Sequence, residues 1–174
     1  MSETQTLDMI GKRSELLANV VLTRRLNIDV HSFGTNDEGP DLICTIRPDP
    51  EEKVHGFLPF GVFVWGTSKE LASEQEATRF ARSQRAKIRK EAFLMPVIVL
   101  LFSMKKDEAY FAWLVEPCKD SARLTHLTDL DFALFDGKQL DRMVFRIKKW
   151  YQRMQSTILA GVGEVGASQP FNGD

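Results

Sequence analysis

The sequence predicts an α/β protein in which helices flank a central mixed β-sheet of five strands, with an additional helix near the C-terminus. The hydrophobic pattern along the chain reads helix, three strands, helix, two strands, helix. Apolar residues make up 43% and charged residues 27% of the chain, which is an ordinary globular balance. Its 174 residues suit one domain, or one domain with an appendage.

One helix and three strands are expected in the first part of the chain. Apolar residues three and four positions apart predict a helix over about residues 7–26. Residues 27–33 alternate between polar and apolar and predict a half-buried strand, and a Gly- and Pro-rich turn separates it from a second strand over 41–47. Residues 57–65 are apolar at nearly every position, so we expect a strand that is buried on both faces.

The second part is expected to supply two helices and two strands. Residues 73–93 have helical periodicity, and strands follow over about 96–102 and 109–115. A helix between the third and fourth strands is the crossover that parallel pairing requires, whereas the first three strands can form a meander. Residues 118–137 look irregular, and apolar residues at helical spacing predict a last helix over about 138–160.

These elements define the expected domain organisation and compartment. No membrane-spanning segment is recognisable, because the longest apolar runs are far shorter than the roughly 18 residues that cross a bilayer. No secretory signal is recognisable either, because the first residues contain neither a basic region nor an apolar one. We therefore expect a cytoplasmic protein with no membrane partner. The expected divisions are a flexible N-terminus over 1–8, an α/β domain over 9–135, a C-terminal helix over 136–160 and a disordered tail over 161–174.

Charge is strongly segregated, although the formal net charge is only −1. Residues 79–90 carry six basic groups and no acidic group, and helical geometry places most of them opposite the apolar stripe of their helix. Such a face can bind nucleic-acid phosphates, and the alternative is an ordinary solvated surface. The candidate nucleic-acid-binding residues are Arg79, Arg82, Arg85, Arg89 and Lys90.

Two further patterns in the sequence bear on ligand binding. Trp150 and Tyr151 lie among basic residues of the last helix and could stack on bases, or they could belong to the core or to a partner interface. Cys44 and Cys118 are far apart, and the three histidines match no metal-binding spacing. We expect Cys44, within the second strand, to act as a small buried hydrophobe.

Five segments occur in an order and spacing that resemble a known family. They are Gly11-Lys-Arg-Ser-Glu15, Glu38-Gly-Pro-Asp41-Leu-Ile, Phe60-Gly-Val-Phe-Val-Trp65-Gly-Thr, Met95-Pro-Val-Ile-Val-Leu-Leu and Ala109-Tyr-Phe-Ala-Trp113-Leu. Over about residues 9–117 the chain resembles the DUF4365 family, a branch of the PD-(D/E)XK restriction-endonuclease-like superfamily. The resemblance implies a restriction-endonuclease-like sandwich.

The resemblance also implies a metal-dependent nuclease site, to which only part of this sequence conforms. Asp41 matches the carboxylate that begins the second strand, and Glu15 matches the acid of the first helix, so these two residues would hold Mg²⁺ in an active enzyme. The remaining acid or Gln and the Lys are replaced by Phe63 and Trp65, which can neither bind metal nor carry a proton. Lys69 is the first candidate for a relocated lysine, and Lys87 and Lys12 are further candidates.

Three functions therefore stay open from the sequence. The first is a catalytically degenerate nuclease-like domain, with no cofactor, that acts as a nucleic-acid-binding or assembly module. By resemblance its setting is bacterial DNA processing or phage defence, with a nucleic acid or a partner protein as its target. The second is an active Mg²⁺-dependent DNA nuclease with a relocated lysine, and the third is a homodimeric structural protein. Loss of two of the four expected catalytic groups favours the first.

Overall fold

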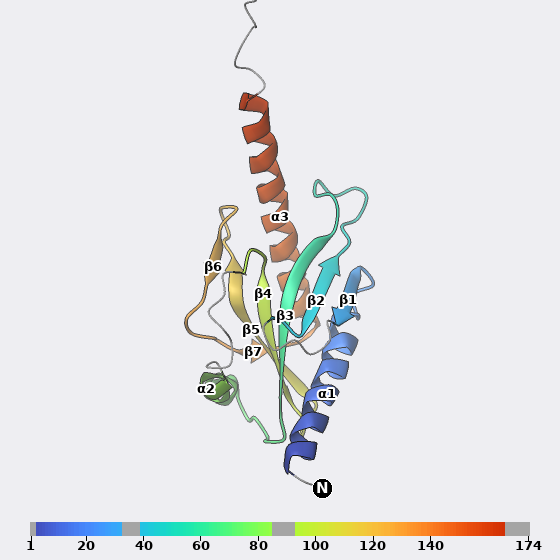
Figure 1. Ribbon diagram of the computed structural model, residues 1–174, viewed down its shortest axis with the longest axis vertical. Coiled ribbons are helices and arrows are strands. Elements are labelled where there is room, and N and C mark those ends of the chain that lie inside the picture. Colours follow the sequence, from blue (N-terminus) through green and yellow to red (C-terminus); the bar gives the residue numbers. More distant parts are fainter. Residues whose placement is uncertain (1–2, 33–38, 85–92, 166–174) are drawn as a thin grey trace, which may run out of the picture.

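The computed structural model describes residues 3–32, 39–84 and 93–165, and its side chains over 8–31, 39–84 and 93–160. Within these residues it has a mixed sheet of seven strands and three helices, one of them C-terminal (Figure 1). The α/β class and the order of the long elements are therefore as predicted.

The five long strands lie in sequence order across the sheet. Strands β1 (Ile28–Ser32), β2 (Leu42–Ile46) and β3 (Leu58–Thr67) form an antiparallel meander. β3 pairs in parallel with β4 (Val97–Ser103), and β5 (Glu108–Pro117) returns antiparallel to β4. The predicted meander and the predicted parallel crossover are both confirmed.

The sheet has two more strands than the predicted five. β6 (Leu124–His126) and β7 (Ala133–Leu134) both pair with β5, in the region expected to be irregular. They contain only three and two residues, which is too short for alternation of polar and apolar residues to be recognised. Their backbone groups hydrogen bond to β5, which alone makes them strands.

The three helices differ from the expected ranges at their ends. α1 (Glu3–Leu22) begins within the segment assigned to a flexible N-terminus, so residues 3–8 are helical. It ends four residues early, where the Thr23 hydroxyl donates to the Asn19 carbonyl and the Arg25 N–H bonds the Leu22 carbonyl in a tighter turn. α2 (Glu74–Gln84) lies within the predicted helix, whose remainder is partly outside the described residues. α3 (Gly137–Val165) continues into the segment expected to be a disordered tail.

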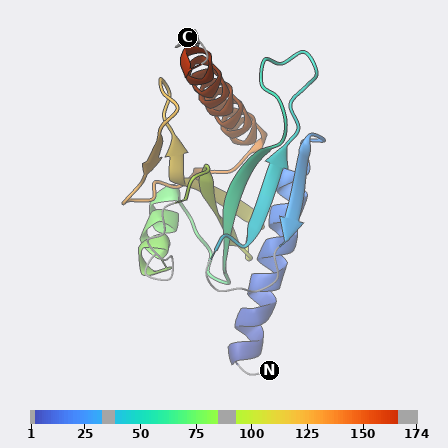
Figure 2. The same ribbon diagram turned by 45° about the horizontal axis from the view of Figure 1, so that its top comes forward.

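Helices cover both faces of the sheet and create two hydrophobic cores. On β4, Ile98, Leu100 and Phe102 pack toward α1 and α3, whereas the alternate residues pack toward α2. Figure 2 shows α1 and α3 on one side of the sheet and α2 on the other. Cys44 is fully buried in the first core, as predicted, and burial raises the pKa of its thiol to about 12. No helix in the described part of the chain is long and apolar enough to span a membrane.

α1 packs directly on the backbone of β3 at Gly66. A β-carbon built at Gly66 would lie 2.1 Å from Ser14 Oγ and 2.7 Å from Ile10 Cγ2, both on α1. Ser14 is fully buried, and its hydroxyl donates to the Ile10 carbonyl at 2.7 Å, so it leaves no polar group unpaired in this contact. The glycine is therefore required because the helix approaches the strand too closely for any side chain.

Replacing Gly66 tests this close approach. We expect Gly66→Ala to lower the free energy of unfolding by about 1–3 kcal/mol, the usual cost of overpacking. The matched control is Gly11→Ala on α1, where no atom lies within 4 Å of the new β-carbon and alanine favours the helix. Urea unfolding of both variants measures the difference, and equal stabilities would contradict the close contact.

Candidate functional site

Asp41 lies at the point where β2 begins and accepts a hydrogen bond from β3. Leu42, the first residue of β2, pairs with Val62 of β3 and is the final pair of the ladder at this end. Beyond that pair, the Val64 N–H donates to Asp41 Oδ2 at 2.6 Å. The carboxylate therefore continues the strand ladder with its side chain, which is a structural role.

The carboxylates of Asp41 and Glu15 lie close enough to interact electrostatically. Burial raises the pKa of Asp41 above its ordinary value, the Val64 hydrogen bond opposes this shift, and the negative charge of Glu15 adds to it. Glu15 itself is exposed on α1. The fold thus brings together the two acidic residues that the sequence singled out.

Lys69 does not join these two acids. β3 ends at Thr67, about 10 Å along the strand from Val64 at 3.3 Å per residue. The Lys69 N–H bonds Thr67 Oγ1, its carbonyl accepts from Ser103 Oγ, and its side chain is exposed. The ammonium of Lys12 instead pairs with Asp8 at 3.1 Å, and Lys87 lies outside the described residues.

The described residues around Asp41 do not fit a magnesium centre. Nowhere in the described side chains do three His, Cys, Asp or Glu residues gather as metal ligands. Two carboxylates alone leave most positions around an octahedral Mg²⁺ ion without a protein ligand, and neither Lys12 nor Lys69, the two candidate lysines within the described residues, is placed to position water. This arrangement supports no metal-dependent step.

Phe63 and Trp65 belong to the second hydrophobic core, between the sheet and α2. The Phe63 ring meets Phe93 edge-to-face at a centroid distance of 6.0 Å. The Trp65 ring lies 6.5 Å from that of Phe132, which is buried. The two positions that depart from the resemblance therefore contribute to packing, where each aromatic pair is favourable by about 0.5–1.5 kcal/mol beyond burial.

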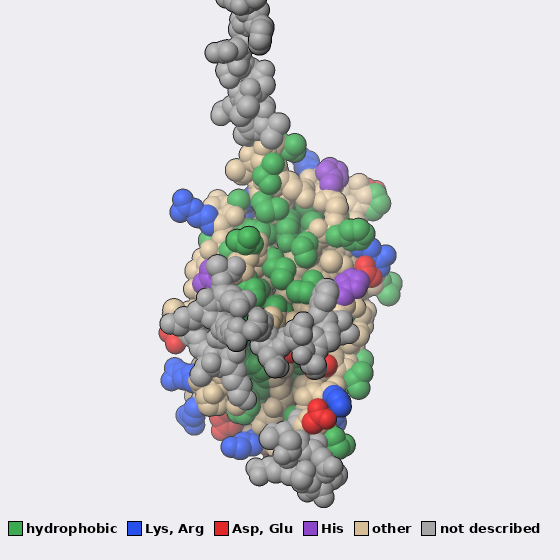
Figure 3. Space-filling view, viewed as in Figure 1, with side chains coloured by type: hydrophobic (Ala, Val, Ile, Leu, Met, Phe, Trp, Pro, Cys, Tyr) green, Lys and Arg blue, Asp and Glu red, His purple; other side chains and the backbone are tan. Residues whose placement is uncertain are grey.

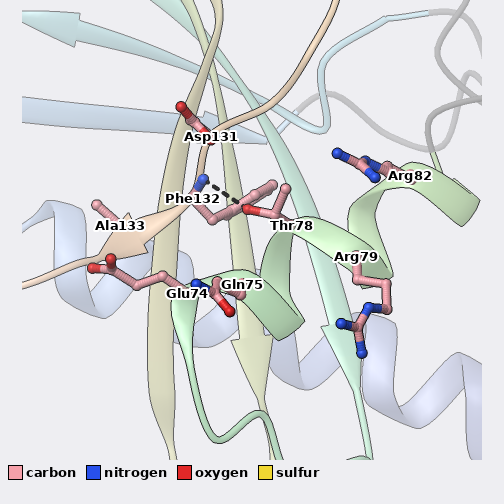
Figure 4. A pocket seen from close by; sticks show the side chains of 8 residues that line it. All are labelled: Glu74, Gln75, Thr78, Arg79, Arg82, Asp131, Phe132 and Ala133. Atoms are coloured by element: carbon pink, nitrogen blue, oxygen red, sulfur yellow. Dashed lines mark hydrogen bonds between the residues drawn. The ribbon is translucent and has the colours of Figure 1, made fainter.

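An open pocket of about 560 Å³ lies between α2 and the segment that precedes β7. Arg79 and Arg82 line one part of it, and Glu74 and Ala133 lie at the other (Figure 4). The remaining lining residues are Gln75, Thr78, Asp131 and Phe132. Two of the predicted nucleic-acid-binding arginines therefore flank a real depression in the surface.

Hydrogen bonds from α2 hold the opposite wall of this pocket. The Phe132 N–H donates to Thr78 Oγ1 at 3.3 Å, and the Leu134 N–H donates to Glu74 Oε1 at 3.0 Å. The start of α2 is capped, since the Glu76 N–H donates to Ser73 Oγ and the Glu76 carboxylate accepts from Ala72 N–H. The Ser73-x-x-Glu76 spacing that caps the helix can be read from the sequence. The packing of residues 132–134 against α2 depends on tertiary structure, so the sequence did not predict it.

The two arginines have no carboxylate partner among the described side chains, and both are exposed. Some other arginines of this protein do form ion pairs: Arg13 pairs with Asp107 and Arg25 pairs with Asp141. The guanidinium groups of Arg79 and Arg82 are thus free to bind an anion. The other three predicted residues, Arg85, Arg89 and Lys90, lie outside the described part of the chain.

The proposed base-stacking role of Trp150 and Tyr151 is wrong. Their side chains are only 3% and 6% exposed and belong to the first core. Trp150 Nε1 donates to the Arg123 carbonyl at 3.1 Å, and the Tyr151 hydroxyl donates to the Pro59 carbonyl at 2.7 Å. Their alternative interpretation, as core residues, is confirmed.

Asp41 provides a test of structural against metal-binding roles. Because its pKa is raised in the folded state, ionisation of this carboxylate lowers stability as pH rises through the folded pKa. Asp41→Asn keeps an acceptor for the Val64 N–H and removes the charge, so we expect its free energy of unfolding at pH 7 to be at least that of the wild type. At pH 3, below the unfolded pKa of about 3.9, the wild-type carboxyl is itself mostly protonated, so any advantage of the variant should disappear.

Asp41→Ala is the matched variant, because it removes the acceptor as well as the charge. We expect it to lose about 1–3 kcal/mol, the cost of an unpaired buried N–H. Urea unfolding at both pH values separates the two contributions. If asparagine were as damaging as alanine at pH 7, the charge itself would be needed there, as it is in a cation site.

No match to this chain was found among family models, curated proteins or solved structures. Its function must therefore be inferred from the geometry of its own residues.

Proposed function

We propose that this protein is a non-catalytic nuclease-like domain that binds nucleic acid through the outward face of α2. The observation that carries the binding role is the pair of exposed guanidinium groups of Arg79 and Arg82, which lie beside an open pocket and have no carboxylate partner among the described side chains. Arginine binds phosphate oxygens with two parallel hydrogen bonds, and such contacts supply most of the affinity for a nucleic-acid backbone.

The order of the elements supports a restriction-endonuclease-like domain. A helix, an antiparallel three-stranded meander, a crossover helix and a parallel fourth strand follow one another, as the resemblance leads us to expect. Asp41 begins β2, and Phe63 and Trp65 lie on the adjacent strand β3. The positions of these residues are thus consistent with those of a nuclease site.

Catalysis is disfavoured by the roles that these residues now have. A lysine in place of Trp65 would direct its ammonium into an aromatic core against Phe132, at a large desolvation cost. Asp41 is already engaged by the Val64 N–H. The alternative, an active Mg²⁺-dependent nuclease, requires a relocated lysine. Its first candidate, Lys69, follows the end of β3 that is farther from Asp41, which disfavours this alternative.

The pocket geometry favours binding from the arginine side. Glu74, which accepts from the Leu134 N–H, and Asp131 are both exposed and leave negative charge on the side of the pocket away from the arginines. A polyanion would therefore follow the outer face of α2, where Gln75 can also donate hydrogen bonds, and avoid the Asp131 wall.

Binding is tested with Arg79→Ala/Arg82→Ala and a fluorescent DNA duplex. Since each phosphate contact contributes about 0.9 to the slope of log K against log salt, we expect this variant to reduce the slope by about 2. The control is Lys105→Ala/Lys106→Ala, which removes the same charge from two exposed lysines that pair with Glu70. Fluorescence anisotropy at several salt concentrations provides the measurement, and equal losses in both variants would contradict a specific surface.

The same incubations, with Mg²⁺ or Mn²⁺ present, separate binding from cleavage. We expect salt-sensitive binding with intact DNA. Metal-dependent cleavage that disappears in Asp41→Asn would overturn the non-catalytic proposal. No binding to DNA or RNA at low salt would overturn the nucleic-acid proposal, and a protein partner or homodimer would then be the better candidate.

A further inference from the structure

The outward side of α3 carries a second basic stripe, which contains an exposed aromatic ring. Lys138, Arg142, Phe145 and Lys149 are spaced by four, three and four residues, so they form one row along the helix. The row is about 16 Å long at 1.5 Å per residue. Phe145 is 62% exposed, although a ring of this size is usually buried.

The positive charge of this stripe is not neutralised by neighbouring acids. Lys138, Arg142 and Lys149 are all exposed and have no carboxylate partner among the described side chains. Of the two nearby acids in the sequence, Asp141 pairs with Arg25 of α1, and Asp136 accepts from the Gln139 N–H and keeps its negative charge at the start of α3. The stripe therefore favours an anionic partner.

Phe145 adds a flat apolar surface within this charged row. The Lys149 ammonium lies 5.6 Å from the centre of its ring and also donates to Gln152 Oε1. The other members of the row are cationic, so the stripe lacks the group of apolar residues that forms the centre of a protein interface. One exposed ring flanked by cations instead fits a nucleotide, which offers a base to stack and a phosphate to pair.

This stripe is separate from the α2 surface. α3 packs on the face of the sheet that carries Ile98 and Leu100, whereas α2 packs on the opposite face. The outward sides of the two helices therefore point in opposite directions, so a short duplex bound to one does not reach the other. The α2 surface offers no such ring between its arginines. The aromatic residue between Arg79 and Arg82 is Phe80, and its side chain packs toward the second core.

We infer that the Lys138–Arg142–Phe145–Lys149 stripe is a second nucleic-acid-binding surface, which selects single strands by stacking one base on Phe145. The inference rests on the proposed function only for the class of ligand. The three cations contact the backbone phosphates, and the ring is accessible only to a base that is not already stacked within a duplex.

The test measures anisotropy of labelled oligo(dT) and of a duplex with Phe145→Ala. Stacking contributes about 1–3 kcal/mol per base, so we expect oligo(dT) affinity to fall roughly 5- to 150-fold, with duplex affinity unchanged. The matched control is Phe57→Ala, which removes a ring that is 71% exposed in the loop before β3. Both rings are exposed, so both variants should fold, and thermal unfolding verifies this.

Three further outcomes separate this inference from the proposed function. Lys138→Ala/Arg142→Ala/Lys149→Ala should reduce the salt slope for oligo(dT), whereas Arg79→Ala/Arg82→Ala should act mainly on the duplex. Loss of duplex binding in the α2 variant, with equal oligo(dT) affinity in Phe145→Ala and wild type, would overturn this inference alone. Binding of poly-glutamate as tight as that of oligo(dT) would overturn it in favour of an acidic protein partner.

Discussion

The contact between α1 and the backbone of β3 at Gly66 is the constraint on which the arrangement of this protein depends. Because no side chain separates the helix from the strand there, α1 lies close to the part of β3 that follows the residues paired with β2. This position brings Glu15 toward Asp41 and buries Ser14 against the sheet. α1 and α3 then share one hydrophobic core, which includes Ala18 of α1 and Leu140 of α3.

β3 explains why the acidic pair is not accompanied by the rest of a catalytic centre. Its alternate residues Phe60 and Val62 pack in the first core, while Phe63 and Trp65 pack in the second. Phe63 and Trp65 are only partly buried, but their rings pack against Phe93 and Phe132 and occupy the positions two residues apart where a metal ligand and a lysine would stand. In this setting the Asp41 carboxylate accepts from the Val64 N–H, a role that requires no metal.

Periodicity over long segments made most of the fold predictable from the sequence. The five long strands and the crossover helix have strong alternation or helical spacing, and the crossover determined the parallel pairing of β3 with β4. β6 and β7 could not be predicted, because two or three residues contain too little pattern and their pairing depends on the position of β5.

The candidate site was predictable only where local sequence determines it. Helical geometry placed Arg79 and Arg82 on an exposed face, but the pocket beside them needs the distant segment at Phe132 to dock on Thr78. For α3, composition alone could not show which aromatic faces water. Trp150 and Tyr151 lie on the side that meets the sheet, and Phe145 lies on the opposite side of the helix.

Several cations of this protein are held in ion pairs among the described side chains, unlike those on the two outer helix faces. Lys148 of α3 is largely buried and bonds Glu52 at 2.9 Å, Arg146 pairs with Glu116, and Arg25 pairs with Asp141. These ion pairs attach loops and helices to the body of the protein, and their charges are not available to a ligand. The cations on the outward sides of α2 and α3 form no such ion pair with any described side chain. Exposed like charges along one helix repel each other by a few tenths of a kcal/mol per pair. A polyanion would relieve that repulsion on either face, and only the α3 face adds an aromatic ring that could distinguish an unpaired base from a duplex.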